Sequence, residues 1–178
     1  MKTLFSATLG LVTLLAAGLV FSQAGTAPKD ATFVSVAEQQ QVAQAQKAAR
    51  YDQLIKVVDA GKYNVAIAII HHETPNTPGT HSGVTEVFVV TSGSGTLTTG
   101  GTIPDAKANN VACCGPGTGG AKIEGGTSRH MVTGDVAVVP PNVPHWWSDV
   151  TPPLNVLVIR PDTDRVLPAG YVNPALKQ

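Results

Sequence analysis

The pattern of apolar and polar positions predicts mainly β-structure for this chain. From residue 53 onward, short runs rich in Val, Ile and Thr alternate with clusters of Gly, Pro and Asn. Such runs are typical of β-strands, and the clusters between them are typical of turns. Strands are predicted at residues 54–58, 63–72, 85–91, 96–99, 136–139, 145–149 and 155–159. This set favours an all-β fold, an antiparallel jelly-roll barrel.

Four segments without a periodic pattern separate these strands. Residues 76–83 are predicted to form a loop, and residues 93–95 a turn between two strands. Residues 100–121 are rich in Gly and show no period, and a loop of that length in a compact domain is usually functional or disordered. We expect it to lie over the barrel mouth as a lid. Residues 125–126, both Gly, predict a two-residue hairpin turn.

One segment before the strands has helical character. Ser35 and Glu38 match a capping box, in which the hydroxyl caps the helix and the carboxylate reaches back to it. The Ala- and Gln-rich stretch that follows predicts a short N-terminal helix ending near Tyr51. Val42 and Ala45 fall on one modest apolar face, which can lie against the barrel.

The first 24 residues have the pattern of a secretory signal peptide. Lys2 supplies the positive start, residues 9–21 are mostly apolar, and Ser22 and Ala24 place small residues where signal peptidase cleaves. This run is shorter than the roughly 20 apolar residues that a membrane span needs, which favours a cleaved signal over the alternative, an uncleaved membrane anchor. We expect a secreted or periplasmic protein with no stable membrane anchor after cleavage. The predicted parts are a signal peptide (1–24), an arm and helix (25–51), a barrel (52–165) and a C-terminal tail (166–178).

Composition narrows the choice of partners. The chain has 178 residues, which suggests one domain. Lys plus Arg and Asp plus Glu each number 12, and no basic stripe is present, so nucleic acid is a poor partner. A small-molecule ligand is expected instead.

Two blocks of the sequence carry a spacing that suits a metal site. The first holds His81 and Glu86, and the second holds His145. Two imidazoles and one carboxylate can hold a divalent ion and leave coordination positions open. Strand alternation puts Glu86 on the face of Phe88, and His145 on the face of Trp147. Both faces are expected to line the barrel cavity. A hydrogen-bonded His–Glu–His cluster without metal is the alternative.

The first block resembles the first of the two paired motifs of the cupin superfamily. That motif usually runs His-x-His, three or four residues, Glu, six residues and Gly. His81, Glu86 and Gly93 match it, but Gly79 stands where the first His is usual.

The second block resembles the second cupin motif, which runs Gly, five residues, Pro-x-Gly, two residues, His, three residues and Asn. Gly134, Pro140 and His145 match it. Asn142 replaces a Gly, and Asn is the next most tolerant residue in a left-handed turn. Asp149 replaces the Asn.

The resemblance implies a cupin barrel with one divalent metal ion, for which Mn, Fe, Zn and Ni all suit such ligands. His81 and His145 would be ligands, and Glu86 a ligand or a catalytic general base. Phe88 and Trp147 would shape the substrate pocket. His72 is a candidate fourth ligand, with a core histidine as the alternative, because it is in phase with small residues of its strand.

The remaining chemistry lies in two cysteines and a few cations. Cys113 and Cys114 are adjacent and are the chain's two cysteines, so they form either a strained disulfide ring or two free thiols in a Gly-rich loop. A set of basic residues could recognise an anionic substrate: Lys122, Arg129 and Arg160.

Two functions are compatible with these observations. One is a metal-dependent cupin enzyme of the oxygenase, isomerase or lyase type, acting on a small organic substrate. The other is a non-catalytic module that binds a small molecule or sugar. By analogy with the fold, we expect a homodimer.

Overall fold

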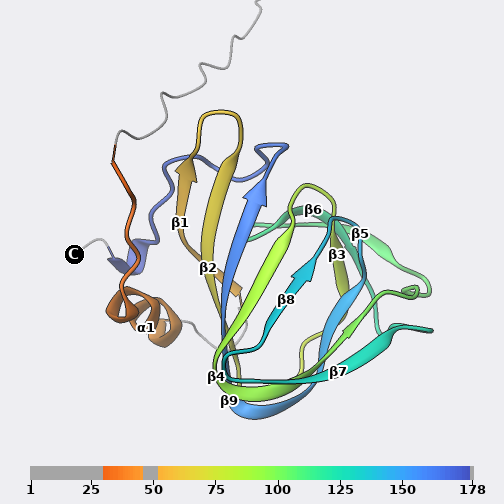
Figure 1. Cartoon of the computed structure of the whole chain (residues 1–178). Helices are drawn as coiled ribbons and strands as arrows, with labels where there is room; N and C mark the ends of the chain where they lie inside the picture. The colour runs from red at the N-terminus through yellow and green to blue at the C-terminus, as the bar shows by residue number, and fades with distance from the viewer. Residues whose placement is uncertain (1–29, 46–51, 177–178) are drawn as a thin grey trace, which may run out of the picture.

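The computed structural model describes residues 30–45 and 52–176. One α-helix and a single antiparallel sheet, curled into half a barrel, make up most of it (Figure 1). A 3-10 helix, η1 (Pro174–Leu176), follows the last strand. The other elements are α1 (Val36–Ala45), β1 (Asp52–Asp59), β2 (Asn64–His72), β3 (Gly79–His81), β4 (Glu86–Thr99), β5 (Lys107–Val111), β6 (Gly115–Gly119), β7 (Thr127–Val132), β8 (Val136–Val139) and β9 (His145–Asp162).

The capping box predicted for the helix is confirmed. The Ser35 N–H donates to Glu38 Oε2 at 2.7 Å, and the Glu38 N–H donates to Ser35 Oγ at 3.1 Å. Val42 is buried against Ile55 and Ile69, so the helix covers the outer face of β1 and β2. The expected continuation to residue 51 lies outside the described residues.

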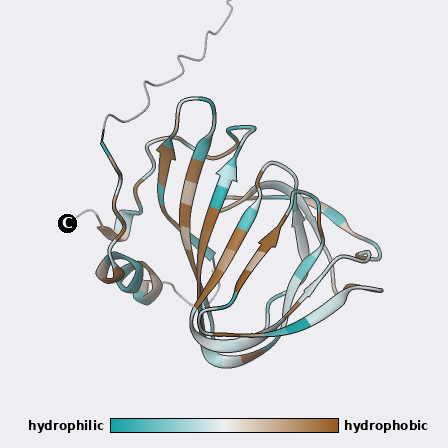
Figure 2. Cartoon of the chain, in the orientation of Figure 1, coloured by the Kyte–Doolittle hydropathy of each residue, from teal (hydrophilic) through white to brown (hydrophobic). Residues whose placement is uncertain are grey.

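Strand β9 organises the sheet. It pairs antiparallel with β2 over its C-terminal half and with β4 over most of its length, and its first residue pairs with β3. Alternate residues of β9 and its neighbours point into the half-barrel and form the main core, among them Val156, Val158, Ala68 and Phe88. Figure 2 shows apolar residues running along β1, β2 and β8. The all-β, antiparallel jelly-roll fold predicted from the sequence is confirmed.

Two predicted strand breaks are wrong. β4 runs through residues 93–95 without reversing. Gly93 (φ 74°) does not form a turn there, and its missing side chain lets the Pro153 carbonyl pack closely against the strand. The strands predicted at 145–149 and 155–159 are likewise one strand, β9. The register between β4 and β9 shifts near the Gly and Pro residues that suggested turns, so both strands continue past them.

The predicted loops also contain more structure than expected. Residues 76–83 include β3, and residues 100–121 include the hairpin of β5 and β6. A side chain at Gly117 would collide with the Thr80 carbonyl, so glycine allows β6 to lie against β3. Residues 125–126 form no hairpin, because Glu124 pairs with Thr102 and Thr127 with Thr99. The Gly-rich segment borders the barrel cavity through residues of this hairpin, and its role as a lid stays a prediction.

The segment predicted as a tail packs against the barrel. Leu167 belongs to the main core, and its carbonyl accepts a hydrogen bond from Asn64 Nδ2 at 2.9 Å. Asn173 Nδ2 donates to the Leu54 carbonyl at 2.6 Å, which fixes the chain to β1.

The predicted signal peptide, residues 1–24, lies outside the described residues. Within residues 30–45 and 52–176, no helix has the length and apolar character that crossing a membrane requires.

Candidate metal centre

A cavity of about 590 Å³ opens inside the half-barrel. Its walls come from β1, β2, β3, β4, β9 and the turn between β5 and β6. The six residues that the sequence proposed for a site all line it: His72, His81, Glu86, Phe88, His145 and Trp147.

Three of these side chains converge. One ligating atom from each of His81, Glu86 and His145 lies within 4.8 Å of the other two. They come from the end of β3 and the starts of β4 and β9. The Asn142 N–H donates to the His81 carbonyl at 2.8 Å, which ties β3 to the turn before His145. Asn142 has a φ of 64°, the left-handed conformation that the sequence predicts at this position.

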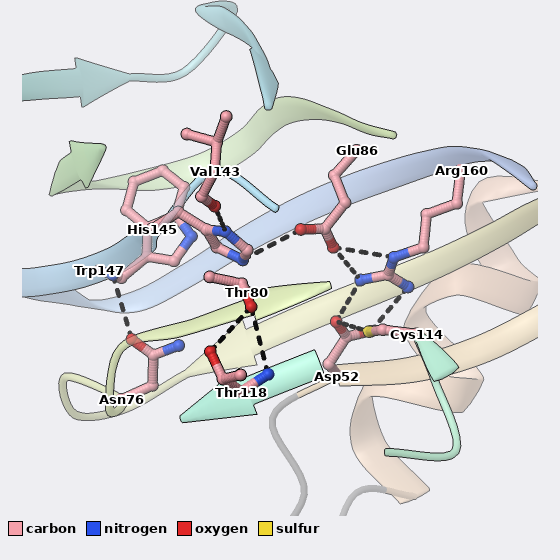
Figure 3. Close-up of polar contacts among 10 residues, drawn as sticks. All are labelled: Asp52, Asn76, Thr80, Glu86, Cys114, Thr118, Val143, His145, Trp147 and Arg160. Atoms are coloured by element: carbon pink, nitrogen blue, oxygen red, sulfur yellow. Dashed lines mark hydrogen bonds and ion pairs between the residues drawn. The ribbon is translucent and has the colours of Figure 1, made fainter. Parts of the chain in front are cut away.

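Two contacts orient His145. Its Nδ1 lies 3.0 Å from the Val143 carbonyl and donates to it, and its Nε2 lies 3.0 Å from Glu86 Oε2 (Figure 3). Burial lowers the pKa of His145, but the hydrogen bond and negative charge of Glu86 outweigh burial and raise it. Without a cation between them, Nε2 therefore carries a proton toward Glu86. With a cation there, the same nitrogen presents its lone pair.

Glu86 is held in its charged form by Arg160. Its Oε1 accepts a hydrogen bond from Arg160 Nε at 2.9 Å and forms an ion pair with Arg160 Nη2 at 2.8 Å. Burial by itself raises the pKa of Glu86, but the charge of Arg160 and the hydrogen bond from His145 bring it well below its usual range. Oε1 is thus committed to Arg160, while Oε2 faces the imidazole of His145.

The ring of His81 is neutral and has a nitrogen to spare. Burial is the main cause that lowers its pKa to about 4. Its Nδ1 is buried and has no hydrogen-bond partner among the described residues. A neutral imidazole with an unpaired nitrogen, a second imidazole and an ionised carboxylate are donors that suit a divalent transition metal. The residues present therefore fit the ion that the sequence motifs imply.

His72 lies in the same cavity but outside this group of three. It is 1% exposed, on the inward face of β2 as predicted, while His71 faces outward and bonds to Asn155 at 2.7 Å. Burial lowers the pKa of His72 to about 4, so its ring is neutral at pH 7. Its role as a fourth ligand remains a prediction.

Phe88 and Trp147 form an aromatic wall beside the imidazoles. Each is 1% exposed, and their ring centroids are 6.0 Å apart. The ring of Phe88 also lies 5.9 Å from that of His145. The Trp147 indole N–H is buried with no hydrogen-bond partner among the described residues, which makes it a donor for a polar ligand.

Sequence reasoning missed the role of Arg160. It considered this residue with Lys122 and Arg129 for substrate recognition, yet Arg160 is 0% exposed and bridges Glu86 to Asp52. Lys122 and Arg129 are exposed and do not line the cavity. The signal was present, because Arg160 lies in phase with the buried Val156 and Val158 of β9.

The cysteines are two free thiols, so the disulfide alternative is not the one the structure shows. Cys114 is fully buried in the main core and not in a loosely packed loop. Its thiol donates to Asp52 Oδ2 at 3.7 Å (Figure 3). Asp52 thereby links the cysteines to Arg160, whose Nη1 donates to Asp52 Oδ1 at 3.1 Å.

Comparison with known proteins identifies the family of the chain. Residues 62–176 match the family model described as Cupin, so the chain belongs to the cupin family. None of the curated proteins matches the chain in sequence.

One solved structure reaches a TM-score of 0.50 with this chain, and others are similar to it at lower scores. A protein of Bacillus halodurans is 12% identical, with a TM-score of 0.50, covering 82% of this chain and 90% of its own. A Klebsiella pneumoniae protein with a double-stranded β-helix domain is 14% identical, with a TM-score of 0.47, covering 76% and 93%. KdgF of a Halomonas species is 16% identical, with a TM-score of 0.41, covering 66% and 85%. At these identities the likeness is one of fold.

Proposed function

We propose that this protein is an exported cupin that holds one divalent transition metal through His81, Glu86 and His145, and that it is a metal-dependent enzyme acting on a small organic substrate. The observation that carries the proposal is the convergence of these three donors, within 4.8 Å of one another, in a cavity of about 590 Å³. That volume is within the range of about 300–1,000 Å³ common for small-molecule sites.

Each residue around the donors has a separate task. The Val143 carbonyl and Arg160 set the directions of His145 and Glu86 before any ion binds. Because Oε1 of Glu86 is committed to Arg160, Glu86 suits a ligand better than a general base. Phe88 and Trp147 give the cavity an aromatic wall, and the Trp147 indole N–H can bind a polar group of the substrate. The ion itself would supply Lewis acidity and open positions for substrate, water or oxygen.

Metal content tests the proposal directly. Protein purified from the compartment to which it is exported should contain about one equivalent of Mn, Fe, Zn or Ni by elemental analysis. His145→Ala should lose it, since only two donors from one segment remain. His130→Ala is the matched control, because His130 is exposed on β7 and should retain the metal. Equal metal content in wild type and His145→Ala would contradict the proposal.

A non-catalytic binding module is the second candidate, and one contact favours it. Arg160 and His145 already compensate the charge of Glu86 without an ion. Gly79 in place of a ligating His points the same way. A metal-free protein that binds a small organic ligand, and loses that binding in Trp147→Ala, would support the module. A stoichiometric metal would support the enzyme.

Export and self-association complete the proposal. The signal pattern of residues 1–24 supports a mature chain starting near Gly25, and intact-mass measurement on exported protein would show Met1 if cleavage fails. A homodimer is supported by three exposed valines on β7 and β8, which are 48%, 59% and 61% exposed: Val132, Val136 and Val138. A second copy would cover this apolar surface.

A further inference from the structure

The turn between β5 and β6 brings two thiols to the same side of the chain. Adjacent residues on a strand point in opposite directions, but Cys113 and Cys114 lie in a turn closed by a hydrogen bond of 3.1 Å from the Cys114 N–H to the Val111 carbonyl. As a result, the two sulfur atoms and a carboxylate oxygen of Asp52 lie within 4.8 Å of one another.

This second cluster is distinct from the imidazole centre. It shares no residue with His81, Glu86 and His145, and Arg160 lies between the two, bonded to Glu86 and to Asp52 (Figure 3). Both cysteines line the cavity. Cys114 is fully buried and Cys113 is partly exposed, so the pair is enclosed on one side and reachable on the other.

We propose that Cys113, Cys114 and Asp52 form a second cation site, selective for a soft, thiophilic metal ion of the Cu(I), Zn²⁺ or Cd²⁺ class. Thiolate sulfur prefers such ions, whereas the His and Glu donors of the first centre also accept harder ions such as Mn²⁺. Two donors on consecutive residues act as a chelate, so the second sulfur binds at a small entropic cost. Cu(I) and Cd²⁺ would therefore favour the thiolate site and Mn²⁺ the imidazole centre, whereas Zn²⁺ suits both.

The hydrogen bonds of Asp52 leave room for a ligand role. Each of its oxygens accepts from Arg160, and a carboxylate oxygen has a second lone pair. Asp52 places a carboxylate charge within 4.8 Å of the two sulfurs, and each thiol that gives up its proton adds a negative charge next to it, which suits a cation. Asp52 is also the residue that supplies an oxygen donor next to the two sulfurs.

Binding is a proton exchange and involves no electron transfer. Two S–H bonds release their protons to solvent as two sulfur–metal bonds form, and the oxidation state of the metal is unchanged. Burial raises the pKa of the Cys114 thiol well above its usual range, so it keeps its proton until a cation displaces it.

A cadmium titration of the reduced, full-length protein tests the site. Cd²⁺ is the probe, because its bonds to thiolate give an ultraviolet charge-transfer band that imidazole and carboxylate ligands do not give. Wild type should show this band, saturating at one equivalent of thiolate-bound Cd²⁺. Cys113→Ser should lose the band or weaken binding at least tenfold. Ala112→Ser, an exposed position in the same turn, should match wild type.

Two further variants separate this site from the first one. His145→Ala should keep the cadmium–thiolate band even though it loses metal at the imidazole centre, so failure of one site does not imply failure of the other. Asp52→Asn should keep the band and bind more weakly. Because Cys114 is in the core, Cys113→Ser is the decisive thiol variant, and its thermal unfolding should be checked against Ala112→Ser.

Three results would overturn the inference. The first is a band unchanged in Cys113→Ser. The second is cadmium that binds without any thiolate band. The third is exported protein whose mass is lower by two hydrogens and whose thiols do not react, which would show that the pair is joined as a disulfide.

Discussion

Replacing Arg160 by Met should be among the most costly single changes in this protein. Arg160 is 0% exposed and is the cation that faces both Glu86, with its side chain 3% exposed, and Asp52, at 20%. Methionine is of similar length and apolar, so the change removes the charge while largely filling the space. It leaves Glu86 as a buried anion with His145 as its remaining partner.

The expected loss is about 3–5 kcal/mol, the usual cost of removing one partner of a buried ion pair. Whole domains are stable by about 5–15 kcal/mol, so the variant should unfold at a clearly lower urea concentration with little change in slope. Most of the lost stability should come from Glu86, because the carboxylate of Asp52 is partly exposed and can be hydrated further when Arg160 is removed.

A second substitution distinguishes a stranded charge from lost packing. Arg160→Met combined with Glu86→Gln removes the anion too, so the double variant should recover about 1–3 kcal/mol of the loss. Arg129→Met, on the exposed strand β7, is the matched control and should change stability by less than about 0.5 kcal/mol. A loss below about 1 kcal/mol in Arg160→Met, or a double variant no more stable than the single one, would refute the reasoning.

Three other predictions follow from single positions. The pKa of His72 is about 4 in the folded protein and 6.5 in the unfolded chain, so protonation favours the unfolded state. As the pH falls from 6.5 to 4, this group should lower the free energy of unfolding by up to about 3 kcal/mol. In urea unfolding, His72→Gln should lose less stability than wild type over that pH range. Gly79→His should tighten metal binding in calorimetry by adding a ligand. The gain should be reduced by crowding, because a Cβ at this position lies 3.1 Å from the Thr118 carbonyl oxygen. No gain would argue against an ordinary cupin geometry. Val136→Asp should convert a dimer to a monomer in light scattering, and a monomeric wild type would exclude the dimer.

Local pattern was enough to predict much of the site. The inward positions of Glu86, Phe88, His145 and Trp147 follow from strand alternation, which depends only on the period of two along a strand. The cap at Ser35 is equally local, since donor and acceptor are three residues apart. The expectation that the imidazoles and the carboxylate would meet came from the resemblance of the two blocks to the paired cupin motifs.

The prediction of turns and loops from the sequence failed in the segments rich in glycine and proline. A glycine has the same sequence signature whether it makes a turn or lets another strand come close, and Gly93 and Gly117 do the latter. The deciding contacts, with Pro153 and Thr80, come from distant segments. Backbone pairing of β5 with β6 needs no apolar pattern, so residues 107–119 could not be recognised as strands from their composition.

The sequence by itself determined the strand-rich fold and the cavity-facing residues, because periodicity acts over a few residues, and its two cupin-like motifs pointed to the three donors of the imidazole centre. Only the tertiary structure decided that Arg160 bridges Glu86 and Asp52, and that Asp52 lies beside two thiols about 60 residues further along the chain. Such contacts depend on which strands pair and in what register, and no local pattern encodes that choice.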